Sequence, residues 1–274
     1  MSRIIDAHAH LSEHLQDELI PYAALNGLKY SLDELLRLMD EGGITRGLLL
    51  SPPLKGGIPL PNERILELCR RSDGVLSPIL TVEPSAENVE NAVQLARNNR
   101  AEVKGFKIRL GYLKIFADDP VYDPLYAYAE SEDLPVMFHT GDTASHTGSL
   151  DHSHPLTLDR LANGRAGLKI VACHFGNPWI QDVGELIYKH PNMYADISGL
   201  IVGGSKYITG YLDSLADQLT RAIYFAGGAE KVIFGTDYPV STPALALDLV
   251  GKLRIDAEDA ERILWKNAAR VFRI

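Results

Sequence analysis

The sequence predicts an α/β barrel of eight parallel strands with an extra helix at its carboxyl end. Strand-like and helix-like stretches alternate along the whole chain, which indicates a parallel sheet. An open doubly wound sheet would usually carry a Gly-rich phosphate loop after the first strand, where this chain has His8 and His10. No Pro-, Gly- or Ser-rich linker divides the sequence, so we expect one barrel domain over residues 1–274.

Eight short apolar runs bounded by polar or turn-forming residues are the expected strands. The first opens with Ile4 and Ile5, almost at the start of the chain, and the second is closed by Ser51 and two prolines. The expected strands cover residues 4–10, 44–50, 75–82, 103–110, 135–140, 168–174, 192–198 and 231–236.

Helical patterns separate these strands. Ser31 and Glu34 have the spacing of a capping box at the start of the first helix, which ends at Gly42. We read residues 11–30, and the polar stretch after the fifth strand, as loops. The expected helices cover residues 32–41, 61–72, 86–100, 124–132, 156–162, 180–189, 211–225, 243–253 and 258–271.

Composition and charge exclude several classes of function. The formal net charge is −9 and the sequence pI is about 5.5, which argues against a nucleic-acid or anionic-membrane surface. No apolar run is long enough to cross a bilayer, and two cysteines do not make a disulfide framework. We therefore expect a cytoplasmic protein that acts on a small molecule. The apolar stretch 19–30 is a candidate lid or contact of a homodimer.

Polar side chains stand where four of the expected strands end. His8 and His10 end the first strand, His139 the fifth, His174 the sixth, and Asp237 the eighth. Carboxyl ends of barrel strands meet at one face, and the eighth strand closes against the first. Histidine and carboxylate ligands suit a divalent metal, and zinc, manganese and iron all remain open on ligand type alone. A structural, hydrogen-bonded role is the alternative for any one of these histidines, but not for the whole set.

Strand alternation predicts which side chains point into the barrel. On the first strand it places Asp6, His8 and His10 on one face. On the sixth strand it sends Cys173 away from His174, as a buried inert thiol.

The same alternation aims Lys107 into the barrel on the fourth strand and Asp237 on the eighth. Phe106, Ile108 and Phe234 then face the helices.

These strand-end motifs, in this order, resemble the amidohydrolase superfamily, and in particular its amidohydrolase-related branch of TIM-barrel metal-dependent hydrolases. The resemblance runs from the first strand to the last helix. It rests on the segments Asp6-Ala7-His8-Ala9-His10, Gly105-Phe106-Lys107-Ile108, His139-Thr140-Gly141, His174-Phe175-Gly176-Asn177-Pro178-Trp179, Gly235-Thr236-Asp237-Tyr238-Pro239 and 263–272.

The resemblance implies roles for the strand-end residues. His8, His10, His139 and Asp237 would bind one divalent metal, for which we favour zinc, with manganese or iron as alternatives. His174 would be a catalytic, substrate-polarising residue, or a ligand in two-metal relatives. A second metal would require a carboxylated lysine on the fourth strand.

Three further residues are candidate substrate contacts. Lys107 has the strand position of the carboxylated lysine of two-metal relatives, but we favour an uncarboxylated Lys107 that binds a substrate carboxylate. Arg109 is either a second anion-binding residue or a solvated residue near a strand end. His154 resembles a position of a subgroup with Thr-Gly-Asp-Thr before a later His-Pro-Leu, and it either contacts substrate or caps the next helix.

The resemblance does not fix the reaction, since the branch contains hydrolases and decarboxylases. Our first hypothesis is hydrolysis of an amide, ester or lactone of a small, carboxylate-bearing molecule by metal-activated water, with Asp237 as proton acceptor. The alternative is metal-dependent nonoxidative decarboxylation of an unsaturated or aromatic acid, similar to that of aminocarboxymuconate semialdehyde decarboxylase. A binding protein without enzymatic activity is a third hypothesis, which the intact ligand set disfavours.

Overall fold

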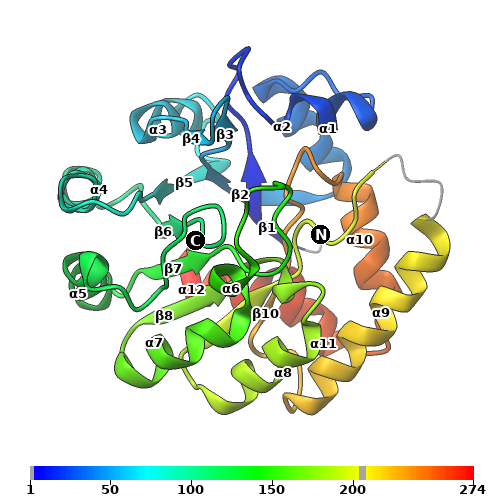
Figure 1. Cartoon of the computed structure of the whole chain (residues 1–274). Helices are drawn as coiled ribbons and strands as arrows, with labels where there is room; N and C mark the ends of the chain where they lie inside the picture. The colour runs from blue at the N-terminus through cyan, green and yellow to red at the C-terminus, as the bar shows by residue number, and fades with distance from the viewer. Residues whose placement is uncertain (1–2, 204–207) are drawn as a thin grey trace.

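Eight parallel strands form a barrel in the computed structural model, which describes residues 3–203 and 208–274 (Figure 1). Their order around the sheet is β1-β2-β5-β6-β7-β8-β9-β10, so neighbours in the barrel follow one another along the chain. The strands are β1 (Ile4–His10), β2 (Ile44–Leu50), β5 (Leu76–Thr81), β6 (Phe106–Ile108), β7 (Pro135–Phe138), β8 (Lys169–Ala172), β9 (Met193–Asp196) and β10 (Val232–Ile233).

The last strand and the residues after it pair with the first strand, as the sequence predicted. The backbone N–H of Ala7 donates to the Phe234 carbonyl at 3.0 Å, and that of His10 donates to the Tyr238 carbonyl at 2.8 Å. A third bond of 2.7 Å joins the Asp237 N–H to the His8 carbonyl. These bonds fix the height of Asp237 relative to the two histidines.

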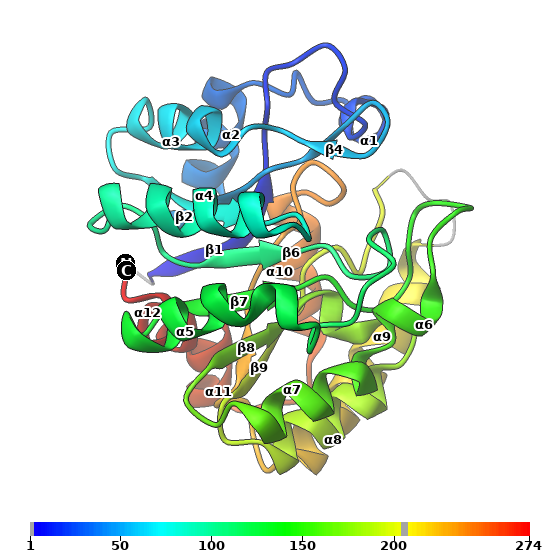
Figure 2. The same cartoon turned by 60° about the vertical axis from the view of Figure 1, so that its left-hand side comes forward.

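Helices surround the barrel on its outer side (Figures 1 and 2). They are α1 (Ile20–Leu25), α2 (Leu32–Glu41), α3 (Asn62–Arg70), α4 (Ala86–Asn98), α5 (Asp123–Ser131), α6 (Leu150–Ser153), α7 (Leu158–Gly164), α8 (Ile180–Lys189), α9 (Ile208–Phe225), α10 (Pro243–Lys252), α11 (Ala257–Glu261) and α12 (Asn267–Phe272). Short helical turns cover Pro120–Tyr122, Pro155–Thr157 and Cys173–Gly176, and a π-helical turn, Arg262–Lys266, joins α11 to α12. Among the described residues, no helix has both the length and the apolar character needed to span a bilayer.

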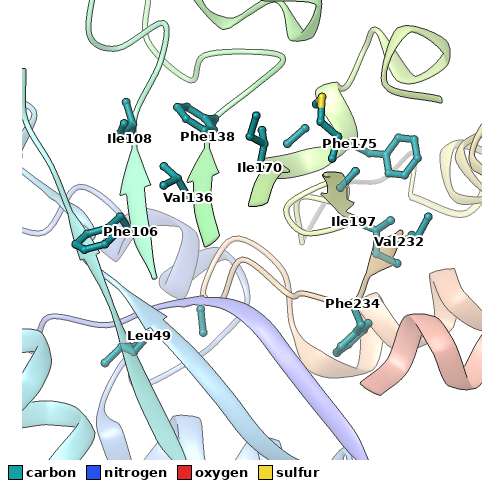
Figure 3. Close-up of a cluster of buried hydrophobic side chains, with 14 of the residues drawn as sticks. Leu49, Phe106, Ile108, Val136, Phe138, Ile170, Phe175, Ile197, Val232 and Phe234 are labelled. Atoms are coloured by element: carbon teal, nitrogen blue, oxygen red, sulfur yellow. The ribbon is translucent and has the colours of Figure 1, made fainter. Parts of the chain in front are cut away.

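Two apolar clusters fill the structure. The larger lies between strands and helices, and Figure 3 shows part of it, including Phe106 and Ile108 of β6 and Phe234 after β10. The smaller consists of inward-facing residues such as Ile5, Leu48 and Met137, together with Ala268, Val271 and Phe272 from α12. The carboxyl-terminal helix therefore packs against the inner cluster of the barrel, while the opposite end carries the loops.

The structure adds elements that the sequence did not reveal. The segment read as one loop, residues 11–30, contains α1. After β2, a small antiparallel hairpin forms from β3 (Pro53–Leu54) and β4 (Ile58–Pro59). These elements depend on tertiary contacts: the Asn26 amide beyond α1 donates to the Pro239 carbonyl at 2.9 Å. An α-helix of six residues and strands of two residues are too short to show a recognisable hydrophobic periodicity in the sequence.

Candidate active site

His8, His10 and Asp237 converge at the carboxyl end of the barrel strands. The Oδ1 atom of Asp237 lies 3.2 Å from Nε2 of His10 and 3.6 Å from Nε2 of His8. The ligand atoms of these three residues all lie within 4.8 Å of one another. The arrangement follows from the backbone pairing of the last strand region with β1, so two neighbouring strand ends build one cluster.

Asp6 does not share this cluster, contrary to the alternation prediction. Its pairing with β2 shifts register between Asp6 and Ala9, so the strand bulges and its facing changes. The Asp6 carboxylate instead accepts bonds from the His8 N–H at 3.1 Å and the Thr236 hydroxyl at 2.6 Å. Burial raises the pKa of Asp6 to about 6, despite those opposing hydrogen bonds. Asp6 therefore holds the bulge that redirects His8 and His10.

A second group of candidate ligands, His8, His174 and Asp196, adjoins the first. Asp196 ends β9 and is fully buried. Its Oδ2 lies 3.0 Å from Nδ1 of His8, and its Oδ1 accepts the backbone N–H of His174 at 2.9 Å. Sequence reasoning missed Asp196, although a carboxylate at a strand end was the same signal that identified Asp237.

His174 reaches the site through an unusual backbone rather than through strand alternation. β8 ends at Ala172, and both His174 and Phe175 have left-handed conformations, with φ of 59° and 44°. Cys173 is consequently part of the inner cluster and points into the barrel, so the predicted outward orientation is wrong. The His174 ring lies 5.0 Å from that of His8 between centroids, and its Nδ1 lies 3.1 Å from the Ser198 carbonyl.

His139 lies beside His174 but belongs to neither group of candidate ligands among the described residues. Its Nε2 lies 2.8 Å from the Asp142 carbonyl, and its ring centroid is 4.8 Å from that of His174. The structure therefore places His139 in the site and gives this nitrogen a protein partner. His139 could bind a metal through Nε2 only if it gave up its contact with the Asp142 carbonyl.

The donor set fits a divalent metal. Nε2 of His8 is buried and has no hydrogen-bond partner among the described residues. This nitrogen lies within the cluster, and its lone pair is available to a metal when the proton is on Nδ1. Burial, and then the charge of Lys107, lowers the pKa of His8 to about 3, which keeps the ring neutral. Burial alone would raise the pKa of Asp237, but the hydrogen bond with His10 and the nearby imidazoles hold it well below its usual range. The neutral His8 imidazole and the ionised Asp237 carboxylate are therefore suitable metal ligands.

Asp196 is positioned to orient the His8 ring, because it contacts Nδ1 and leaves Nε2 for the metal. Its carboxylate contacts the His8 nitrogen that is remote from the cluster, as carboxylates commonly do behind metal-bound histidines. We expect Asp196→Asn to weaken metal affinity about 10- to 100-fold while the fold is retained. Competition with a chelating dye measures this affinity, and Asp217→Asn on the surface is the control. Unchanged affinity would contradict the orienting role.

Gly199 allows Asp237 and His174 to approach each other. A Cβ at this position would lie 2.5 Å from Oδ2 of Asp237 and 2.9 Å from Nδ1 of His174, and the φ of Gly199 is +63°. We expect Gly199→Ala to lower turnover about 100-fold, since such a displacement misplaces reacting groups by about 1 Å. Steady-state kinetics test this, with Gly251→Ala, where the added methyl meets no atom within 4 Å, as control. Equal activity of both variants would show that the close approach is not required.

Buried neutral histidines make the metal-free protein sensitive to acid. Burial is the main cause that lowers the pKa values of His8, His139 and His174. Below about pH 6.5 the unfolded chain binds protons that the folded chain does not, so stability falls by roughly 1.4 kcal/mol per pH unit for each histidine. Asp6, with its raised pKa, offsets one histidine between about pH 4 and 6. Urea unfolding at pH 7.5 and 5.5 should show this loss, and equal stability would contradict it.

An open cavity of about 1410 Å³ lies over the cluster. Lys107 and Arg109, both from the β6 region, line it, as does the β3–β4 hairpin. The Lys107 ammonium donates to Sγ of Cys173 at 2.8 Å, a weak acceptor. Arg109 is buried rather than solvated, and it donates to the Gly57 carbonyl at 2.6 Å.

His154 is not among the residues that line this cavity. Its Nδ1 accepts the Leu156 N–H at 3.3 Å at the start of a helical turn, and its ring packs 4.5 Å from Trp179. The geometry therefore corresponds to the capping role, and it gives no support to a substrate contact.

The family model described as amidohydrolase matches residues 5–274, nearly the whole chain. The chain belongs to the amidohydrolase family. This amidohydrolase-family enzyme is similar to the γ-resorcylate decarboxylase of Rhodococcus jostii, with 22% identity over 98% of each chain. The predicted family, barrel fold and enzymatic character are thereby confirmed.

Solved structures agree with the fold. A zinc-bound amidohydrolase from Burkholderia multivorans matches with a TM-score of 0.74 and 18% identity, over 99% of both chains. A dihydroxybenzoic acid decarboxylase from Polaromonas sp. JS666, with bound manganese and the inhibitor 2-nitroresorcinol, matches with a TM-score of 0.70 and 16% identity, covering 100% of this chain and 97% of that one. Structural relatives of this family enzyme therefore bind divalent metals.

Proposed function

We propose that this protein is a metal-dependent nonoxidative decarboxylase of an aromatic or unsaturated carboxylic acid. The observation that carries the proposal is the similarity, over 98% of both chains, to a γ-resorcylate decarboxylase. The sequence favoured hydrolysis and gave decarboxylation as the alternative. The relatives support the alternative better.

His8, His10 and Asp237 would hold the metal, and His139 would join them only by exchanging its contact with Asp142. When bound, a divalent metal supplies a Lewis acid that neutralises and positions the oxygens of the acid substrate. Asp196 would keep His8 in the required orientation from its other nitrogen. The choice among zinc, manganese and iron is open on these ligand types.

Lys107 would bind the carboxylate that is lost. Its ammonium is buried, lines the cavity, and has a thiol as its hydrogen-bond acceptor. Burial raises the pKa of Cys173, so this thiol stays neutral and does not balance the ammonium charge. A substrate carboxylate would accept stronger, charge-assisted hydrogen bonds from this ammonium than a thiol does.

Asp237 and His174 would carry out the proton transfer. One proton is delivered to the carbon that bears the carboxylate, the bond between that carbon and the carboxylate breaks, and its electron pair returns to the ring as carbon dioxide leaves. The pKa of Asp237 is held below its usual range, so its carboxylate rests ionised and would first have to take up the proton that it then delivers to the carbon. His174, whose pKa burial lowers, would be the neutral partner that exchanges this proton with the cavity.

A labelling experiment separates decarboxylation from hydrolysis. The metal-loaded protein is incubated in D₂O with γ-resorcylate and other hydroxybenzoic acids, and separately in H₂¹⁸O with esters and lactones. We expect carbon dioxide and one deuterium at the vacated ring carbon of the product. Incorporation of ¹⁸O into ester or lactone products, with no carbon dioxide from any acid, would instead support hydrolysis and overturn the proposal.

A further inference from the structure

The cavity over the metal cluster has its charged groups and its apolar side chains on different surfaces. His8, His10 and Asp237 lie where the cavity meets the strand ends. The segments that follow β9, β10 and β1, which are neighbours in the closed barrel, form one side of the cavity. This side is an apolar wall that consists of Leu19, Tyr22, Leu200, Ile201, Val202 and Val240.

Hydrogen bonds hold the three segments of the apolar wall together. The side-chain amide of Asn26, just after α1, donates to the carbonyls of Pro239 at 2.9 Å and Val240 at 3.2 Å. The Gly203 N–H donates to the same Val240 carbonyl at 3.2 Å. In Figure 1, α1 and the loops after β9 and β10 lie on the same side of the barrel mouth. The apolar side chains therefore belong to one connected surface.

The apolar wall begins beside the reacting centre. A Cβ on Gly199 would lie 2.5 Å from Oδ2 of Asp237. Val202 is three residues beyond Gly199, so the Cα atoms of the two are at most about 11 Å apart. Val240 is likewise three residues beyond Asp237. A ring held at the metal with a short apolar substituent can therefore reach the wall.

The outer part of the wall leaves apolar surface open to a ligand. Val202 and Tyr211, at the start of α9, line the cavity and are each 43% exposed. The Tyr211 hydroxyl accepts the Asn177 amide at 3.3 Å, and the Asn177 carbonyl accepts the Asp142 N–H at 2.8 Å. Asp142 in turn contacts His139, so Tyr211 is fixed relative to the site. An apolar group bound here would remove this surface from water, which favours binding.

The opposite wall is charged. β5 and β6 lie across the barrel from β9 and β10, four strands away in either direction, and Glu83, Lys107 and Arg109 follow or belong to them. The whole cavity, about 1410 Å³, also exceeds the roughly 300–1,000 Å³ of pockets for drug-sized ligands. We infer that the apolar wall is a subsite for an alkyl or aryl substituent, so that the substrate is a substituted aromatic acid larger than a hydroxybenzoic acid. The loss of its carboxylate rests on the proposed function, but the subsite does not.

Binding of unreactive probes tests the subsite without turnover. Isothermal titration calorimetry measures benzoate, 3-butylbenzoate and 4-butylbenzoate binding to the zinc-loaded wild type, Val202→Ser, Tyr211→Ser and Tyr224→Ser. Tyr224 is the matched control, because it is an exposed tyrosine near the opposite end of α9, roughly 20 Å along the helix axis from Tyr211. Thermal unfolding of each variant verifies the fold.

We expect the wild type to bind at least one butylbenzoate about tenfold or more tightly than benzoate, since each fully buried CH₂ contributes roughly fourfold. Val202→Ser and Tyr211→Ser should each weaken that butylbenzoate about threefold or more and benzoate less than about twofold, with Tyr224→Ser unchanged.

The inference is wrong if neither butylbenzoate binds more tightly than benzoate. It is also wrong if both cavity variants keep the full preference, or if they weaken all three probes equally. Tight binding of a butylbenzoate, with no carbon dioxide released from any acid, would support the subsite and remove the proposed decarboxylation. Release of carbon dioxide from hydroxybenzoic acids without any preference for the butyl probes would do the reverse.

Discussion

Asp237→Asn, assayed at saturating metal, should lose about 10²- to 10⁴-fold in turnover, the usual contribution of a general acid or base. The amide keeps one oxygen near Nε2 of His10, where Oδ1 of Asp237 now lies at 3.2 Å. It cannot carry the proton that the carboxyl delivers. Steady-state kinetics with a metal assay on the same sample provide the measurement.

Asp142→Asn is the control for this experiment, because Asp142 also lines the cavity but contacts His139 through its backbone carbonyl. Its activity should stay close to that of the wild type. An Asp237→Asn variant that turns over normally would remove Asp237 from proton transfer, whatever its role as a ligand.

His8→Ala should abolish stoichiometric metal binding and lower turnover about 10³-fold or more. The variant loses Nε2, the buried atom without a protein partner, and it leaves the Asp196 carboxylate buried without the His8 ring. Metal catalysis supplies several kcal/mol to the transition state, and each 1.4 kcal/mol or so corresponds to tenfold in rate. Mass-spectrometric metal analysis and kinetics measure the two effects.

His146→Ala, at an exposed position of the loop after β7, is the matched control. It should keep both metal and activity. Full metal occupancy and activity in His8→Ala would show that the metal, if required, is held elsewhere. Addition of excess metal to His8→Ala distinguishes weakened affinity from loss of the site.

Much of the fold could be predicted because its signals are local. Apolar strands alternating with capped helices gave all eight barrel strands, and the cap at Ser31 is observed, with its hydroxyl accepting the Glu34 N–H at 3.3 Å. The predicted convergence of His8, His10 and Asp237 is also observed. It could be predicted because strand order alone places the last strand of a closed barrel beside the first.

The remaining details depend on backbone irregularities that alternation does not describe. A bulge in β1 turns Asp6 away from the cluster, and the left-handed residues after β8 bring Cys173 into the barrel beside Lys107. Asp196 could not be assigned from the sequence, because a single aspartate at a strand end has no partner nearby in the chain and its contact, His8, is 188 residues away. Its role becomes visible only when its contact with His8 is seen.

The location of the metal tests the central claim most directly. Crystals of the protein loaded with zinc or manganese are measured at the absorption edge of that metal, and an anomalous difference map is calculated. We predict one strong peak bonded to Nε2 of His8, Nε2 of His10 and a carboxylate oxygen of Asp237, with Asp196 retained behind His8. A fully active protein whose map shows no peak among these three side chains would contradict the account.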